Sequence, residues 1–146
     1  MRGIRRILFV IGVVMISGCD PQLTDDPIPI IAFQDVVINL NLPEFQKLRT
    51  DGNMITVNGG VRGLIIYRVN ANNFNAYERN CSYHPNEAGS TVDIDQSNLF
   101  LKDYSCGSQF SKESGQPQGG PAWRPLRRYR TNVTGSTLTI TSDAIE

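Results

Sequence analysis

Short segments with the pattern of strands, most of them followed by turn residues, constrain the fold of this chain more than any other feature. They cover residues 36–42, 54–58, 63–69, 74–80, 91–95, 98–102, 126–134 and 137–141. Turn chemistry such as Asn58-Gly59-Gly60 separates them, and the chain holds 13 Gly and 8 Pro. Residues 43–49 are compatible with one or two helical turns, but no long stretch has a helical period. The pattern predicts an all-β domain, a sandwich or a small barrel.

The first 18 residues have the composition of an export signal. Arg2, Arg5 and Arg6 give a positively charged start, and residues 7–16 form an apolar run. Such a run is too short to cross a bilayer, which needs about 20 apolar residues. We therefore predict a cleavable signal peptide over residues 1–18 rather than a transmembrane helix.

The end of this signal, Ile16-Ser17-Gly18-Cys19, resembles a bacterial lipobox. In a lipobox the cysteine is acylated and becomes the first residue of the mature chain, which predicts lipidation of Cys19. The alternative is an ordinary secretory signal in which Cys19 is lost or incidental. The lipobox interpretation predicts a tether over residues 19–30 and a domain over 31–146. We expect the chain in the bacterial cell envelope, lipid-anchored to a membrane and facing the periplasm or the cell surface.

The charge of the mature chain excludes one class of partner. Residues 1–18 contain three of the 14 basic residues and none of the 14 acidic ones, so the mature chain has a formal charge of −3. This argues against a nucleic-acid binder. The arginines at positions 124, 127, 128 and 130 favour a solvated strand edge, the alternative being a site for an anionic partner or lipid head groups.

Two segments resemble the second half of a Rieske iron–sulfur domain. They read DYSCGSQF over residues 103–110 and GPAWRPLRRY over residues 120–129. In that family a C-x-x-H ligand pair runs into G-S-x-F, and a G-P-A-x-x-P-L-x-x-Y segment then closes over the cluster. The similarity is best from about residue 64 to residue 140. It implies a Rieske-like fold of small antiparallel sheets with a cluster-binding subdomain inserted near one end.

The same resemblance implies that most cluster ligands are missing. Rieske centres use two thiolates and two imidazoles, supplied by C-x-H on one loop and C-x-x-H on another. On the first loop Cys81 matches, but Tyr83 takes the histidine position and His84 lies one place late. On the second loop Asp103 takes the cysteine position and Cys106 the histidine position. The chain has one histidine in total, so no shift of register restores two imidazoles.

Three interpretations of these residues remain open. The first is a disulfide between Cys81 and Cys106, because the two loop tips meet in the parent fold and exported cysteines tend to pair. The second is a single Zn or Fe ion held by Cys81, His84, Asp103 and Cys106. The third is a non-standard [2Fe–2S] centre on the same four residues.

The preferred functional hypothesis is an exported, lipid-anchored Rieske-like domain without a functional cluster or other cofactor. Its role would be binding or structural, with the membrane as a partner through the N-terminal lipid. No Ser-His-Asp arrangement accompanies the single His84, so we do not expect an enzyme. The alternative hypothesis is an electron-transfer protein with a [2Fe–2S] or mononuclear metal centre. The sequence indicates no particular protein partner and no oligomeric state.

Overall fold

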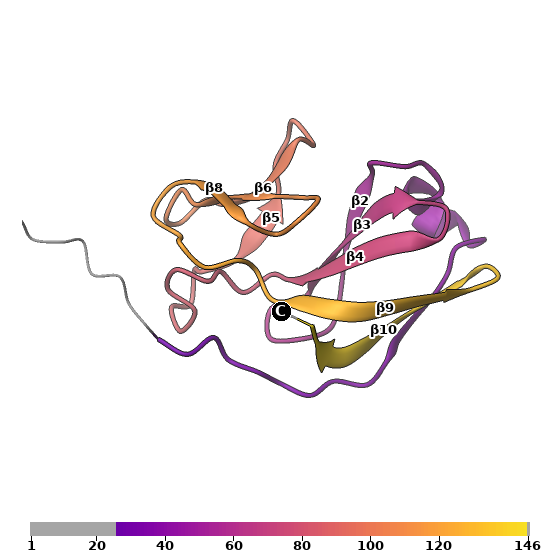
Figure 1. Ribbon diagram of the computed structural model, residues 1–146, viewed down its shortest axis with the longest axis horizontal. Coiled ribbons are helices and arrows are strands. Elements are labelled where there is room, and N and C mark those ends of the chain that lie inside the picture. The colour runs from indigo at the N-terminus through magenta and orange to yellow at the C-terminus, as the bar shows by residue number, and fades with distance from the viewer. Residues whose placement is uncertain (1–25, 146) are drawn as a thin grey trace, which may run out of the picture.

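The computed structural model describes residues 26–145, which form two antiparallel sheets and one short 3-10 helix. The larger sheet has the order β1 (Val36–Asn39), β10 (Thr137–Ala144), β9 (Arg128–Thr134), β4 (Asn73–Glu78), β3 (Leu64–Asn70), β2 (Met54–Val57). The smaller has the order β5 (Val92–Ile94), β6 (Phe100–Asp103), β7 (Gln109–Ser111), β8 (Pro117–Gly119). The 3-10 helix is η1 (Pro43–Arg49). Figure 1 shows the smaller sheet beside one end of the larger one.

Strand β3 is buried on both faces and separates two hydrophobic cores. Leu64 and Ile66 face the first core, which lies against the larger sheet, while Ile65 and Tyr67 face the second. This follows from the alternation of side chains along a strand. The second core also takes residues from the smaller sheet and its loops, namely Val92, Leu101, Phe110, Ala122 and Leu126, together with Cys81. Burial of each large apolar side chain contributes about 1.5–3 kcal/mol, so this core holds the loops against the larger sheet.

The structure confirms the predicted all-β class with small antiparallel sheets. Each predicted β segment contains a strand, and residues 43–49 form η1. The smaller sheet is inserted between β4 and β9, as the Rieske resemblance implied for the cluster-binding subdomain. Strands β7 and β8 lie where no strand was predicted. Within residues 26–145, no helix has the length and apolar character needed to cross a membrane.

The predictions for the N-terminus lie largely outside the described residues. The signal peptide, Cys19 and the first part of the tether belong to residues 1–25. From residue 26 to residue 35 the chain has no regular secondary structure and runs along the surface of the domain (Figure 1). We call residues 26–35 the strap.

Two arginines hold the strap. Arg124 Nη1 donates to the carbonyl of Asp26 at 2.8 Å, and Arg127 Nη2 donates to the carbonyl of Ile28 at 3.1 Å. Further along the strap, Phe33 packs edge-on against Tyr129 with ring centroids 5.0 Å apart. The prediction of a solvated edge is therefore wrong for Arg124 and Arg127, because their guanidinium groups are used to bind backbone carbonyls of their own chain.

Candidate metal centre

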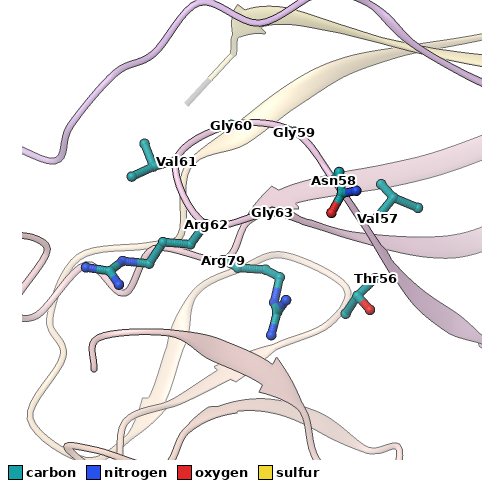
Figure 2. A pocket seen from close by; sticks show the side chains of 9 residues that line it. All are labelled: Thr56, Val57, Asn58, Gly59, Gly60, Val61, Arg62, Gly63 and Arg79. Atoms are coloured by element: carbon teal, nitrogen blue, oxygen red, sulfur yellow. The ribbon is translucent and has the colours of Figure 1, made fainter. Parts of the chain in front are cut away.

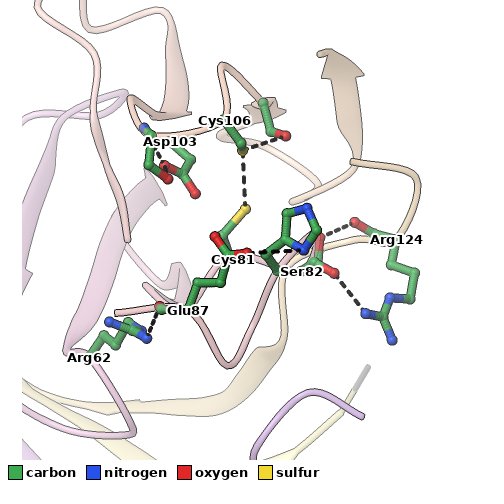
Figure 3. A network of polar contacts seen from close by, with 10 residues as sticks. Arg62, Cys81, Ser82, Glu87, Asp103, Cys106 and Arg124 are labelled. Carbon is green, nitrogen blue, oxygen red and sulfur yellow. Dashed lines mark hydrogen bonds and ion pairs between the residues drawn. The ribbon is translucent and has the colours of Figure 1, made fainter. Parts of the chain in front are cut away.

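Two loops and the end of a strand bring together the thiols of Cys81 and Cys106 and the carboxylate of Asp103. Cys81 lies shortly after β4, Asp103 ends β6, and Cys106 lies in the turn between β6 and β7. One donor atom from each of the three residues lies within 4.8 Å of the other two. Cys81 and Asp103 are fully buried, and Cys106 is half-buried. Figure 3 shows the two cysteines pointing toward each other with Asp103 beside them.

The loop that carries Cys81 is held by backbone pairing and by an arginine from another loop. Cys81 N donates to Ser90 O at 3.1 Å, and Asn80 forms a β-bridge with Thr91. Arg62, between β2 and β3, donates to Asn80 Oδ1 at 2.5 Å, to Ala88 O at 2.6 Å and to Glu87 O. The guanidinium therefore spans both sides of this loop and fixes its width.

The loop that carries Cys106 is a tight turn built around Asp103. Gly107 N donates to Asp103 O at 2.9 Å, and Asp103 N donates to Ser108 O at 2.9 Å. Both the backbone N–H and the hydroxyl of Ser105 donate to Asp103 Oδ1, at 2.8 and 2.6 Å. Gly107 has φ +79°, a conformation that favours glycine. One carboxylate oxygen thus builds the turn, and the other is left for the site.

The second oxygen, Asp103 Oδ2, is buried and has no hydrogen-bond partner of normal geometry. A buried polar atom in this state is costly unless another ligand satisfies it. Burial by itself raises the pKa of Asp103, but hydrogen bonds from Ser105 and the nearby thiols hold that pKa below its ordinary value. The site therefore contains a buried negative charge with one oxygen free to bind a cation.

The two sulfur atoms are 4.0 Å apart, and both cysteines are free thiols. A disulfide requires about 2.05 Å, so the predicted Cys81–Cys106 bond is not formed in this structure. Two sulfurs bound to one tetrahedral ion with metal–sulfur bonds of about 2.3 Å lie about 3.8 Å apart. Burial raises the pKa of the Cys81 thiol well above its ordinary value, and the neighbouring Asp103 raises it further. A cation is the kind of group that would stabilise the thiolate there.

The fourth residue of the predicted metal set, His84, lies outside this group. Its ring packs edge-on against Tyr83, with centroids 3.9 Å apart. Its Nδ1 is 3.7 Å from Glu87 Oε1. The structure therefore brings together three of the four predicted ligands.

These residues do not fit the cluster that the Rieske resemblance implies. A Rieske [2Fe–2S] centre needs two imidazoles on one iron, and the chain has only His84, which is not part of the group. Three clustered donors also fall short of the four that a two-iron centre takes from protein. They match the number of protein ligands of a single ion with one open position.

The segment of residues 120–125 closes the site from one side and was only partly predicted. Ala122 N donates to Ser108 Oγ at 3.1 Å, and the same oxygen accepts from Cys106 Sγ at 3.0 Å. Arg124 joins this segment to the first loop, since Arg124 Nη2 donates to Ser82 O at 2.8 Å and Arg124 O accepts from Ser82 Oγ at 2.6 Å (Figure 3). Arg124 therefore connects the strap directly to the residue that follows Cys81.

A buried carboxylate supports the site from behind, and the sequence did not reveal it. Glu78 ends β4 and is fully buried, and its oxygens accept from the N–H groups of Val61, Arg62 and Asn80 and from the Tyr129 hydroxyl. These bonds hold the β2–β3 loop, from which Arg62 reaches the Cys81 loop. Burial raises the pKa of Tyr129, and the negative charge of Glu78 and the hydrogen bond to it raise that pKa further. The one sequence feature that could have indicated this support is the glycine pair 59–60, which predicted only a turn.

The same β2–β3 loop borders a surface hollow of about 350 Å³ (Figure 2). Its two charged side chains are already paired. Arg62 binds the Cys81 loop, and Arg79 donates to Val92 O at 3.0 Å and to Asp93 Oδ1. The hollow therefore offers no free charged group to a ligand, in contrast to the Cys81–Asp103–Cys106 group.

Comparisons with known proteins found matches among solved structures. Neither a protein-family model nor a curated protein matches the sequence. A solved complex of reduced oxygenase and oxidized ferredoxin in carbazole 1,9a-dioxygenase is similar at 20% identity and a TM-score of 0.49, covering 66% of this chain and 86% of that chain. The ferredoxin of carbazole 1,9a-dioxygenase from Nocardioides aromaticivorans IC177 has 17% identity and a TM-score of 0.45, covering 63% and 86%. A Sphingomonas yanoikuyae B1 ferredoxin has 14% identity and a TM-score of 0.46, covering 65% and 92%.

Proposed function

We propose that this protein is a metal-binding, Rieske-like domain that holds one divalent ion between Cys81, Asp103 and Cys106. The observation that carries the proposal is the buried Asp103 Oδ2, which has no hydrogen-bond partner of normal geometry and lies beside two sulfurs 4.0 Å apart. Two thiolates and a carboxylate suit Zn²⁺ or Fe²⁺. Three protein donors would leave one position of a tetrahedral ion open.

The ion decides which activity the domain has. Zn²⁺ has no redox chemistry, so a zinc centre would stabilise the loops and act as a Lewis acid at the open position. Iron would supply one-electron chemistry, which corresponds to the electron-transfer hypothesis from the sequence. The half-buried position of Cys106 supports the iron alternative, because it places one ligand within reach of a partner's surface.

The location of the domain is also part of the proposal. We propose that Cys19 is acylated and anchors the domain to a membrane of the bacterial cell envelope, with the chain after it acting as the tether. The support is the lipobox-like segment and the Arg-rich, apolar start of the sequence.

A metal-free binding or structural role is the second candidate function. The observation that favours it is the position of Cys81 inside the second core, where a Cys81–Cys106 disulfide would crosslink the two loops. A bond closing a loop of this length would contribute roughly 3 kcal/mol, less any strain.

The test is metal analysis of the full chain, purified under anaerobic, reducing conditions and reconstituted separately with Zn²⁺, Fe²⁺ and Co²⁺. We expect one ion per chain and, for Co²⁺, thiolate-to-metal absorption in the near ultraviolet. Cys81→Ser, Cys106→Ser and Asp103→Asn should each lose the ion or weaken its binding strongly. His84→Ala is the matched control and should retain it.

Two results would contradict this assignment. If none of the three ions binds to protein that is folded by circular dichroism, the metal proposal is wrong and the metal-free candidate is preferred. If His84→Ala loses the ion as completely as Cys81→Ser does, the three-ligand set is wrong.

A further inference from the structure

The two thiols of the site differ in their access to solvent. Cys81 is fully buried in the second core, whereas Cys106 is half-buried on the turn between β6 and β7. An external reagent can therefore reach Cys106 and not Cys81. Thiol–disulfide exchange depends on this access as well as on the reactivity of the sulfur.

A disulfide needs the two sulfurs to approach from 4.0 Å to about 2.05 Å. The Cys106 turn is open on one side, because a side chain built on Gly107 would meet no atom within 4 Å. On its other side the backbone of Gly107 and Ser108 packs against Gly120, so the approach falls to the cysteine side chains rather than to the turn backbone. Besides its contact with Cys81 Sγ, Cys106 Sγ donates a hydrogen bond to Ser108 Oγ at 3.0 Å. A thiol is a weak donor, so little is lost when this bond breaks.

We propose that Cys106 and Cys81 carry out thiol–disulfide exchange with an external disulfide, with Cys106 as the attacking thiol and Cys81 as the resolving thiol. This inference deepens the proposed function. It rests on that function in one respect, because the two sulfurs that exchange are the two that would hold the ion. The external disulfide is a small-molecule disulfide or a disulfide of another exported protein, and it supplies the oxidising equivalents.

The exchange has two balanced steps. In the first, Cys106 Sγ bonds to one sulfur of the external disulfide R–S–S–R, whose S–S bond breaks, and the proton from Cys106 leaves with the released RSH. In the second, Cys81 Sγ bonds to Cys106 Sγ, the mixed disulfide breaks, and the proton from Cys81 leaves with a second RSH. The cysteine pair loses two electrons and two protons, and the external disulfide gains them.

Exchange and metal binding exclude each other at this site. In the oxidised state both sulfurs are bonded to each other, and Asp103 alone is left as a donor from the group. A single carboxylate does not hold Zn²⁺ in a site of this kind, where three protein ligands are usual. The redox state of the pair would therefore control whether the ion is bound, and reduction would restore the site.

The test uses the reduced full chain and oxidised glutathione as the probe, with peptide-level mass spectrometry so that Cys19 is followed separately. We expect the peptides of Cys81 and Cys106 to become joined by a disulfide. In Cys81→Ser the glutathione adduct should accumulate on Cys106. In the matched variant Cys106→Ser, Cys81 should remain a free thiol, because it is buried.

The order of reaction can also be read without substitutions. Brief alkylation of the reduced, unsubstituted protein with iodoacetamide should label Cys106 before Cys81, so the test does not depend on either variant folding. Labelling of Cys81 first, or a glutathione adduct on Cys81 in folded Cys106→Ser protein, would contradict the proposal, as would the absence of the joined peptides.

Metal release is a separate readout. In Zn²⁺-loaded protein, a chromophoric chelator should detect release of the ion in step with disulfide formation. Disulfide formation in protein that never binds metal would contradict the proposed function and leave the exchange chemistry intact. Metal binding that persists after complete oxidation would contradict the mutual exclusion.

Discussion

The glycine at position 60 provides the sharpest test of how the loop behind the site is held. Gly60 has φ +59°, and a Cβ built on it would overlap Glu78 Oε2. Gly135, in the turn between β9 and β10, has φ +60° and meets no atom within 4 Å. The two glycines therefore have the same backbone conformation and differ in whether the carboxylate lies beside them. Gly60→Ala and Gly135→Ala form a matched pair.

The expected costs follow from this difference. Alanine at either position pays the left-handed backbone cost of about 1–2 kcal/mol, part of which is offset by reduced freedom of the unfolded chain. At position 60 the carboxylate must also move away. Glu78 Oε2 accepts from Val61 N at 2.9 Å and from the Tyr129 hydroxyl at 3.0 Å. Hydrogen bonds to charged groups contribute about 1.5–3 kcal/mol each, so losing both adds at least about 3 kcal/mol.

The measurement is urea unfolding of both variants, followed by far-ultraviolet circular dichroism under reducing conditions. Gly135→Ala should lower the free energy of unfolding by about 1 kcal/mol, and Gly60→Ala by about 4 kcal/mol or more. A difference of that size is a large part of the stability of a small domain. Equal destabilisation by the two substitutions would refute the argument that Glu78 is fixed in place by its partners.

Three further predictions concern a hydrogen bond of Glu78, the lipid anchor and the absence of a Rieske cluster. Tyr129→Phe removes one hydrogen bond to Glu78 without changing the ring, so it should cost about 1.5–3 kcal/mol in the same unfolding assay; no change would show that this bond contributes nothing. Cys19→Ala should leave the protein unprocessed or release it from membranes, because the substitution removes the residue that would carry the acyl chains of the anchor. A variant of mature size that still fractionates with membranes would disprove acylation. Anaerobic reconstitution with iron and sulfide, followed by dithionite reduction, should give no Rieske-type electron paramagnetic resonance signal, because one histidine cannot supply two imidazoles. A stoichiometric signal lost in Cys81→Ser would overturn that conclusion.

The strands that could be predicted from the sequence are those in which apolar and polar residues alternate, or in which both faces are buried. Strand β3 shows this well, because its buried residues fill two cores and form a continuous apolar run from Leu64 to Tyr67. Strands β7 and β8 were missed because each has only three residues, and β8 consists of Pro117-Gln118-Gly119. Proline and glycine indicate a loop in a single sequence, and such a strand is stable only through its neighbours.

The candidate site was predictable where it depended on spacing within one loop. The distance from Gly107-Ser108 back to Asp103 and Cys106 is local, and the structure brings both side chains together with Cys81. The position of the His84 side chain was not predictable. His84 lies one residue after the histidine position of the Rieske motif, and a shift of one residue turns a side chain toward different neighbours. The support from Glu78 and Arg62 was also not predictable, since it joins residues that are far apart in sequence and adjacent only after β3 and β4 pair.

The strap also limits how the domain can be oriented at a membrane. Arg124 binds Asp26 through one nitrogen and Ser82, the neighbour of Cys81, through another, so this point of the strap lies beside the loop that carries Cys81. Six residues lie between Cys19 and Asp26, and the seven Cα–Cα steps that join them span at most about 25 Å. With Cys19 acylated, as proposed, Asp26 would stay within that distance of the lipid surface, and the Cys81 loop would lie beside it. Partners embedded in or bound to the same membrane would then reach Cys106 more readily than partners diffusing far from it.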